Sequence, residues 1–412
     1  GPRDVDAAVD SARAAAEGWR DMPPARRARL LLRAARVLRD RGRELAVLQS
    51  LEAGVPIRVS RDVDAPLAAA QVFHHAGWAD KLGLVVPGMR ARPAGVAAVI
   101  TPAASPLATV AAAVSPALAC GAAVVLKPAP EASLTALRLA EAFAEAGLPP
   151  GVVNVVTGTD AAGSALAAHP GVDVVAFTGS AQAGAEVRRA TAGTGARVTV
   201  DAGGACVHIV FEDAPLDQAV DGAVDAAFVT RGHMIRRGCR LVVQEGVAGA
   251  VLDRLAARLD RLRVGDPLDV NTDVGPVGSP DRRARVAAVV DAAAADGCDV
   301  RRGAGAPPGG AWFAPAVIAG GAAGRAARGE VPGPVLTVES FRTEAEAVAL
   351  ANAAGDGLSA GVWTESGARC LWMAGRLRAG VVWANAFGGS DPARPAGGRH
   401  HLAAFLDLEP VA

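Results

Sequence analysis

The sequence predicts an α/β fold with a doubly wound parallel sheet in the first half and a second α/β domain after it. The chain has 412 residues, which is too long for one ordinary hydrophobic core. Short apolar runs bounded by glycine or proline alternate with stretches of helical periodicity. Such alternation is typical of parallel strands buried between two layers of helices.

Each expected element follows from its own pattern. The helices of the first half share apolar residues at helical spacing and end near proline or glycine; they span residues 4–19, 25–53, 61–82 and 133–146. The strands of the first half are short apolar runs; they span residues 92–101, 122–127, 152–157 and 172–177. A second alternating set begins at residue 204, with helices at 248–262 and 280–295 and strands at 241–244, 335–338, 361–363 and 381–383.

Charge and cysteine usage exclude several classes of protein. The 42 basic and 42 acidic residues balance, so we expect no nucleic-acid or anionic-membrane partner. Five dispersed cysteines form no C-x-x-C pair, which favours reduced thiols and argues against a metal site. No apolar run reaches 18 residues without a charge or a turn residue. We therefore expect a cytoplasmic protein.

A phosphate-binding turn is expected after residue 177. The strand ends at Phe177, the sequence Thr-Gly-Ser follows, and a helix begins near Gln182. Gly179 would let the backbone approach a pyrophosphate, and the helix N-terminus supplies N–H donors. Lys127 ends an earlier apolar strand within reach of a ribose hydroxyl. The alternative for Lys127 is a solvated charge at a strand end.

Ordered motifs carry a resemblance to a known family over nearly the whole chain. They are VVLKP at 124–128, EAGLPPGVVNVVTG at 145–158, AFTGS at 176–180 with Gly184, RVGDPL at 263–268, Glu330 with GPV at 333–335, and GLSAGVW at 357–363. In this order and spacing the chain resembles the aldehyde dehydrogenase superfamily.

The resemblance implies a domain organisation. A Rossmann-like cofactor domain would comprise residues 1–86 and 101–203, and a catalytic-type α/β domain residues 204–391. An oligomerisation arm would comprise residues 87–100 and 392–412. Apolar residues alternate in 92–100 and 403–409, so we expect these segments to pair across a subunit boundary.

The resemblance also implies a cofactor site for NAD or NADP, with departures. The matching positions are Lys127, Gly179, Ser180, Gly184 and Glu330. Pro130 stands where the family has a glutamate that holds the adenosine ribose, and Pro332 replaces the aromatic that follows Glu330's counterpart. We therefore expect NAD(P) binding to be weak or absent.

All three reacting positions of the family are substituted. Ala104, in TPAASP at 101–106, occupies the position of the oxyanion-binding asparagine. Asp201, in VTVDAGG at 198–204, occupies that of the general-base glutamate, and Ile235 that of the nucleophilic cysteine. Cys239 lies four residues after Ile235; it is interpreted as a small apolar residue, with a replacement nucleophile as the alternative. His233 is interpreted as structural, with a base as the alternative.

These substitutions predict a catalytically inactive pseudoenzyme with a structural or regulatory role. It would form a homodimer or a complex with an active homologue. The alternatives are an active NAD(P)-dependent oxidoreductase with a non-standard site, a cofactor-free assembly protein, and a truncated domain of a larger protein.

Overall fold

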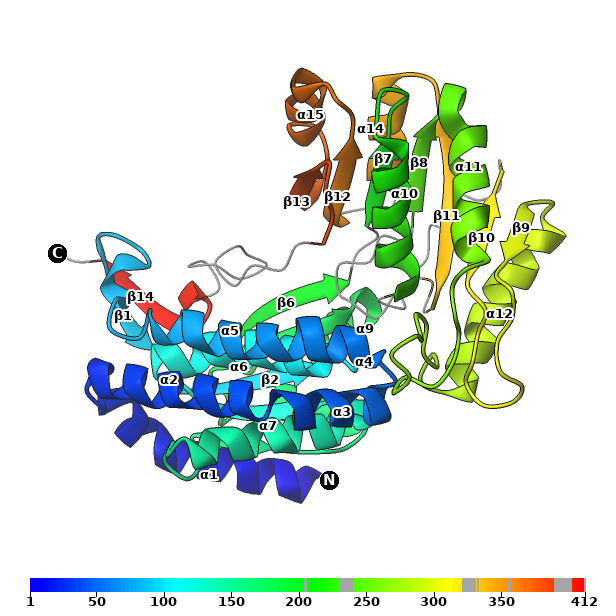
Figure 1. Cartoon of the computed structure of the whole chain (residues 1–412). Helices are drawn as coiled ribbons and strands as arrows, with labels where there is room; N and C mark the ends of the chain where they lie inside the picture. The colour runs from blue at the N-terminus through cyan, green and yellow to red at the C-terminus, as the bar shows by residue number, and fades with distance from the viewer. Residues whose placement is uncertain are drawn as a thin grey trace. The chain divides into compact units, whose positions relative to one another are not determined.

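The chain forms two compact units in the computed structural model, which describes residues 1–203, 206–229, 240–320, 331, 333–353, 357–388 and 402–410. The first unit comprises Gly1–Ala53, Arg58–Ala202 and Ser390–Ala412. The second comprises Gly54–Ile57 and Gly203–Gly389. Each unit contains its own sheet, and Figure 1 labels their elements.

The first unit is built on a five-stranded sheet of order β4-β3-β2-β5-β6. Strands β2 to β5 run parallel to their neighbours. The bounds are β2 (Val96–Thr101), β3 (Ala123–Pro128), β4 (Val153–Val155), β5 (Val174–Ser180) and β6 (Arg197–Gly203). Every residue of β2 and β3 is buried, as expected for the centre of a parallel sheet. The expected doubly wound sheet is confirmed.

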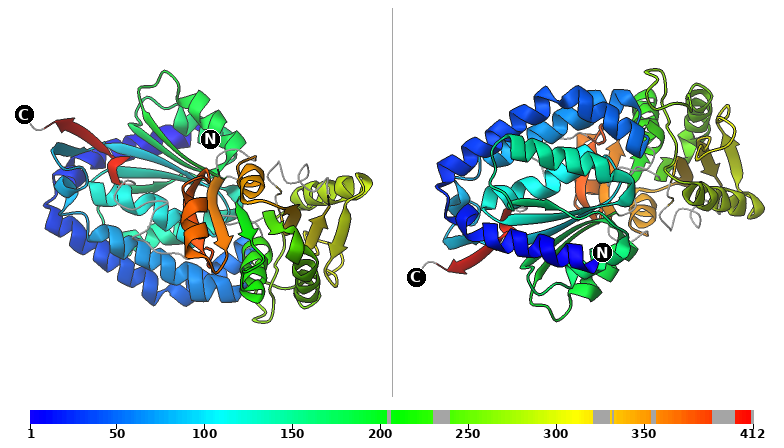
Figure 2. Two further views of the ribbon diagram at one scale, coloured as in Figure 1. Left: turned by 90° about the horizontal axis from the view of Figure 1, so that it is seen from above. Right: turned by 90° about the horizontal axis from the view of Figure 1, so that it is seen from below.

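Helices cover both faces of this sheet (Figure 2). Apolar residues of α1 (Pro2–Asp21), α8 (Asp160–Ala167) and α9 (Ala181–Thr191) form one core with one face of the strands. On the other face lie α6 (Pro106–Cys120) and α7 (Ser133–Glu145), which α2 (Pro24–Asp40), α3 (Gly42–Ala53) and α5 (Ala65–Ala76) contact in turn. Short helical turns complete the unit at α4 (Ile57–Val59), η1 (Ser60–Asp64), η2 (Leu82–Leu84) and η3 (Pro130–Ala132).

Helix spacing explains which residues are inside. In α1 the buried residues recur every three or four positions, and Trp19 at the end of the stripe donates its indole N–H to the Leu118 carbonyl at 3.2 Å. The expected helix 25–53 is two helices: α2 ends at Asp40 and α3 begins at Gly42. Glu52 of α3 accepts the second and third N–H groups of α7, from Leu134 and Thr135, at 2.6 and 2.8 Å.

Arg27 ties together segments far apart in the sequence. Arg27 is only 2% exposed, and burial lowers the pKa of its guanidinium. No described carboxylate pairs with it. Its guanidinium instead donates at 3.1–3.4 Å to backbone carbonyls of Trp19, Arg20, Met22, Ala79 and Ala119. The Arg27 guanidinium thus links the end of α1, the end of α6 and the turn after α5 through hydrogen bonds to their carbonyls.

The expected arm is wrong in part. Residues 96–100 belong to β2 at the centre of the sheet, because an apolar run with neighbours on both sides is buried there. Only β1 (Met89–Pro93) stands apart, and it pairs antiparallel with β14 (Leu406–Pro410) of the same chain. Arg197 anchors this pair by donating to the Leu406 carbonyl and by an ion pair with Asp407 at 3.2 Å.

The second unit contains a seven-stranded sheet of order β13-β12-β7-β8-β11-β10-β9. All neighbours are parallel except β9 and β10. The strands are β7 (Val207–Val210), β8 (Arg240–Gln244), β9 (Asp299–Arg302), β10 (Ala316–Ala319), β11 (Val335–Phe341), β12 (Gly357–Trp363) and β13 (Ala379–Ala384). One face packs on α10 (Leu216–Val224), η4 (Asp225–Val229) and α11 (Glu245–Leu259), and the other on α12 (Pro280–Ala295), α14 (Glu344–Asn352) and α15 (Gly367–Ala374).

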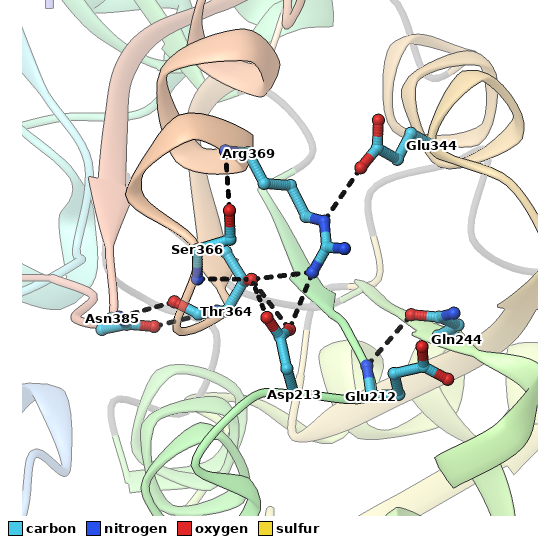
Figure 3. A network of polar contacts seen from close by, with 8 residues as sticks. All are labelled: Glu212, Asp213, Gln244, Glu344, Thr364, Ser366, Arg369 and Asn385. Carbon is cyan, nitrogen blue, oxygen red and sulfur yellow. Dashed lines mark hydrogen bonds and ion pairs between the residues drawn. The ribbon is translucent and has the colours of Figure 1, made fainter.

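A polar network joins the loops after β7 and β12 (Figure 3). Asp213 accepts from the Thr364 hydroxyl at 2.8 Å and from Arg369 at 2.9 Å. Arg369 also binds Glu344 at 2.9 Å, so the ends of three elements are held by one guanidinium. Asn385 donates to the Thr364 carbonyl and accepts its N–H. Each charge in the network has an opposite partner, which is the pattern of a structural clamp.

Two classes of site are absent from the described residues. No helix in these ranges combines the length and apolar character that a membrane crossing needs. No three histidine, cysteine, aspartate or glutamate side chains among them are placed to hold a metal ion.

Replacing Arg27 with methionine should lower the free energy of unfolding by about 3–5 kcal/mol, because it leaves buried carbonyls without a donor. Chemical denaturation monitored by circular dichroism measures the change. The matched control is Arg26→Met, since Arg26 is the exposed neighbour on the same helix. An equal, small effect of both variants would contradict the structural role of Arg27.

Candidate functional site

The polar side chains of the first unit gather where its parallel strands end. From β2 the chain adds β3 and β4 on one side of β2, and then β5 on the other. The strand order therefore reverses at β2 and β5. Ligands of open α/β sheets bind outside the carboxyl ends of the strands at such a switch point. Thr101 ends β2, Lys127 lies near the end of β3, and Gly179 lies near the end of β5.

Lys127 is a buried cation without a hydrogen-bond partner among the described residues. The residue is only 4% exposed, and its neighbour in register on β2 is Ile100. A Cβ placed on Gly163 would lie 3.7 Å from Lys127 Cδ, so the lysine stem runs over α8. Burial lowers the pKa of Lys127, and the charges of Asp160 and Glu131 partly oppose this effect. A desolvated ammonium of this kind fits a ligand oxygen.

Thr101 supplies a second polar atom without a partner. Its Oγ1 is buried and makes no hydrogen bond within the described residues. Thr101 is next to Pro128 in the β2–β3 register, one position beyond the Ile100–Lys127 pair. Buried hydroxyls in proteins nearly always have a partner, so this atom also favours a bound polar group.

The turn from β5 into α9 has the expected strand–turn–helix geometry. Ser180 is the N-cap of α9, and its hydroxyl accepts the Ala183 N–H at 3.2 Å. A Cβ on Gly179 would lie 2.5 Å from Phe177 Cζ, and one on Gly184 would lie 2.7 Å from Val200 Cγ1. Both glycines are therefore required by close packing. A pyrophosphate at Gly179 stays a prediction.

Ala104 lies at the start of α6, where its side chain offers a methyl group and no donor. The residue is 7% exposed, and its carbonyl accepts the Thr109 hydroxyl at 2.7 Å. Ser105, the N-cap, has φ 41° in the left-handed region, so the chain turns sharply before the helix. The N–H of Leu107 is already held by Gln49 Oε1 at 2.9 Å. The side chain of residue 104 therefore contributes no hydrogen-bond donor to this turn.

Of the remaining expected site residues, one lies in the described part of the chain and the others lie outside it. Asp201 lies in β6 and is half-buried. Ile235, His233, Cys239, Glu330 and Pro332 lie outside the described residues. The structure therefore brings Lys127 and Thr101 to one edge of the sheet and leaves the nucleophile and nicotinamide positions as predictions.

Two of the described thiols, those of Cys120 and Cys370, show no activation. Cys120 is fully buried, burial raises its pKa, and its sulfur donates to the Leu402 carbonyl. Cys206 is also buried, and its sulfur accepts the Ser359 hydroxyl at 3.2 Å. The pKa of the half-buried Cys370 is raised by burial and by Asp213. Reactive cysteines have lowered pKa values, so Cys120 and Cys370 lack the property that a nucleophile needs.

Comparison with known proteins decides the family. A model of the aldehyde dehydrogenase family matches residues 1–401. Betaine aldehyde dehydrogenase 2 of Rhizobium meliloti (strain 1021) is 38% identical over 392 residues, covering 93% of this chain and 82% of that protein. The chain belongs to the aldehyde dehydrogenase family.

Solved structures of this family share the fold of the chain. A putative aldehyde dehydrogenase from Burkholderia cenocepacia has a TM-score of 0.94 at 39% identity, covering 99% of this chain and 89% of that one. PnpE in complex with nicotinamide adenine dinucleotide has a TM-score of 0.94 at 36% identity, with the same coverage of both chains. The expected family and the expected α/β fold are both confirmed.

Sequence reasoning missed Asp160 and Thr101. Asp160 begins α8 and is the acidic group that acts most strongly on Lys127. In the sequence Asp160 carries no signal, because no helix is predicted at residues 160–167, where the structure has α8. Thr101 is marked there only as a strand end and as the first residue of the motif TPAASP.

Replacing Lys127 with methionine should weaken the binding of NAD or NADP at least about tenfold, since a charge-assisted hydrogen bond is lost. In the wild type, affinity should fall as pH rises through the lowered pKa of Lys127, because the neutral amine is a poorer donor. Titration monitored by tryptophan fluorescence measures both effects. Lys81→Met is the matched control, because Lys81 is exposed and pairs with Asp80. Equal affinities of the two variants for NAD or NADP would show that Lys127 takes no part in binding.

Proposed function

We propose that this member of the aldehyde dehydrogenase family is a pseudoenzyme that binds a nicotinamide dinucleotide weakly and does not oxidise aldehydes through a thioester. The observation that carries the proposal is the joint replacement of the three reacting side chains by Ala104, Asp201 and Ile235. Its role would be structural or regulatory.

Each replacement removes a different part of the reaction. Isoleucine has no lone pair to attack a carbonyl, and a lost covalent nucleophile leaves only the effects of binding and polarisation. The methyl group of Ala104 cannot donate to an oxyanion, a loss worth roughly 10²–10³ in rate. Asp201 keeps a carboxylate that is one methylene shorter. It is the mildest of the three changes, and alone it would be tolerated.

The first unit supports retention of the dinucleotide. At the switch point Thr101 offers a buried hydroxyl without a partner among the described residues, and Lys127 offers an ammonium whose pKa is lowered by burial. The N-terminus of α9 follows directly on the end of β5. When bound, the dinucleotide would supply a hydride acceptor, while these residues would only hold its ribose and phosphates. Pro130 opposes tight binding because it brings no carboxylate to the ribose. We therefore expect a dissociation constant above about 10 μM.

A second candidate function is an active oxidoreductase that uses another nucleophile. Cys239, four residues after Ile235, is the thiol that this candidate requires. The relatives named as aldehyde dehydrogenases favour it. The lack of any oxyanion donor on Ala104 opposes it, since a thiol alone does not stabilise the tetrahedral intermediate.

The purified chain should form no NADH or NADPH above background with a broad panel of aldehydes. The variant that combines Ala104→Asn, Asp201→Glu and Ile235→Cys should gain activity of at least about 10²-fold over the wild type, since the missing groups return to an intact fold. Absorbance at the reduced-nicotinamide band measures both. Wild-type turnover that is abolished by Cys239→Ser and kept by Cys206→Ser would overturn the proposal and establish the second candidate.

We further propose that the chain assembles through the β1–β14 ribbon. Within the described part of the chain, each strand of this two-stranded sheet pairs on one side only, and an open strand edge invites a further strand. The assembly is a homodimer or a complex with an active homologue. Light scattering at micromolar concentration should report a dimer that deletion of residues 402–412 disrupts. Arg90→Ala, a change of a single exposed side chain in β1, is the control that should leave the mass unchanged. A monomer that the deletion does not alter would contradict assembly through this ribbon.

A further inference from the structure

A pocket of about 300 Å³ opens on the second unit, away from any residue assigned a role above. It lies between α12, the end of β9 and the loop that leads into β10. Its lining includes Arg283, Ala287, Arg302, Pro307, Trp312 and Phe313. We propose that this pocket binds a small planar aromatic carboxylate. The inference does not depend on the proposed function.

The pocket is formed before a ligand arrives. Its loop is fixed at both ends, because the Val277 N–H binds the Ala311 carbonyl at 2.7 Å and the Gly303 N–H binds the Pro315 carbonyl at 2.9 Å. Gly310 has φ 59°, and a Cβ there would lie 3.1 Å from Trp312 Nε1. The half-buried indole therefore rests directly on the backbone, and little side-chain ordering opposes binding.

The pocket has room for a ligand because residue 287, which lines it, is an alanine. Arg283, Ala287 and Asp291 recur at intervals of four on α12, so they follow one face of the helix. Ala287 stands between the two charged residues, and its methyl group leaves room above the buried Phe313. Ala287 and Phe313, together with Trp312 and Pro307, give the pocket an apolar side suited to a flat ring, next to the guanidinium groups of Arg283 and Arg302.

The charge of the site selects a monoanion. Arg302 is already held by Asp291 at 2.8 Å. Arg283 forms no ion pair with any described residue and is exposed at the pocket. Two arginines and one aspartate leave a single uncompensated positive charge, which matches one carboxylate better than a phosphate. A guanidinium binds a carboxylate through two parallel hydrogen bonds.

The volume limits the size of the ring system. Pockets near 300 Å³ lie at the lower end of those that hold drug-sized molecules. One or two fused rings with a carboxylate would fill the space, so 2-naphthoate is a suitable probe and 2-naphthamide its neutral counterpart.

Isothermal titration of the full chain with 2-naphthoate should show saturable binding, and the neutral amide should bind at least about fivefold more weakly, since the free charge on Arg283 is then unused. Arg283→Gln should weaken naphthoate binding about tenfold. Arg285→Gln is the matched control, because Arg285 is exposed on the same helix and outside the lining. Circular dichroism checks that both variants are folded.

A second pair of variants tests the location without changing charge. Ala287→Leu should fill the pocket and abolish binding, whereas Ala284→Leu, on an exposed neighbouring position, should leave it unchanged. Absence of saturable heat up to about 5 mM probe would overturn the proposal, since a dissociation constant at this limit corresponds to a binding free energy of about −3 kcal/mol. Equal binding of acid and amide, or naphthoate binding that Arg283→Gln and Ala287→Leu leave intact, would overturn it as well.

Discussion

The complete burial of β2 and β3 is the constraint on which the first unit depends. Both strands have helices on both faces, so every side chain along them must be apolar or satisfied inside the protein. Chemistry is therefore possible only where the strands end. Thr101 and Lys127 occupy these ends, and the Thr101 Oγ1 has no partner among the described residues, while the strand interiors contain only alanine, valine, leucine and isoleucine.

Arg27 and Lys127 show how a buried cation that stabilises the fold can be distinguished from one that can bind a ligand. Arg27 is surrounded by backbone carbonyls from three segments, so its charge is dispersed over several acceptors. Lys127 is buried to a similar degree but has only the distant charges of Asp160 and Glu131. Burial lowers the pKa of both groups. Only the lysine gains from a ligand, because only the lysine still has hydrogen bonds to make.

Much of the fold could be predicted from the sequence, and the failures have physical reasons. Continuous apolar runs located β3 and β5, because burial on both faces requires apolar residues throughout, and helical spacing of apolar residues located α12. The assignment of residues 96–100 to an arm failed because a short apolar run does not reveal whether it has one neighbour or two. The strands β6, β7, β9 and β10 went unassigned. β9 is a half-exposed edge strand rich in charge, which resembles a loop.

The candidate site could be predicted less completely than the fold. Family motifs located Lys127, Gly179 and Ser180, because each stands at the end of a recognisable strand. The packing of Gly179 against Phe177 could not be foreseen, since a glycine required by a ring two residues away and one required by a ligand leave the same letter in the sequence. The pocket beside Trp312 depends on Ala287 and on loop glycines that carry no motif at all.

The proposed loss of reacting groups would be compatible with an intact fold for a thermodynamic reason. Active-site polar groups are commonly held in place at a cost in stability, and their replacement by apolar residues is often neutral or favourable to folding. At Ala104 the methyl group is buried beside the first turn of α6, where an amide would need hydrogen-bond partners. The turn there is set by Ser105 and by the Leu107–Gln49 hydrogen bond, neither of which involves the side chain of residue 104. Selection for stability alone would therefore retain the sheet, the Arg27 contacts and the Asp213–Arg369 clamp. It would place no demand on a residue at position 104 to donate to an oxyanion.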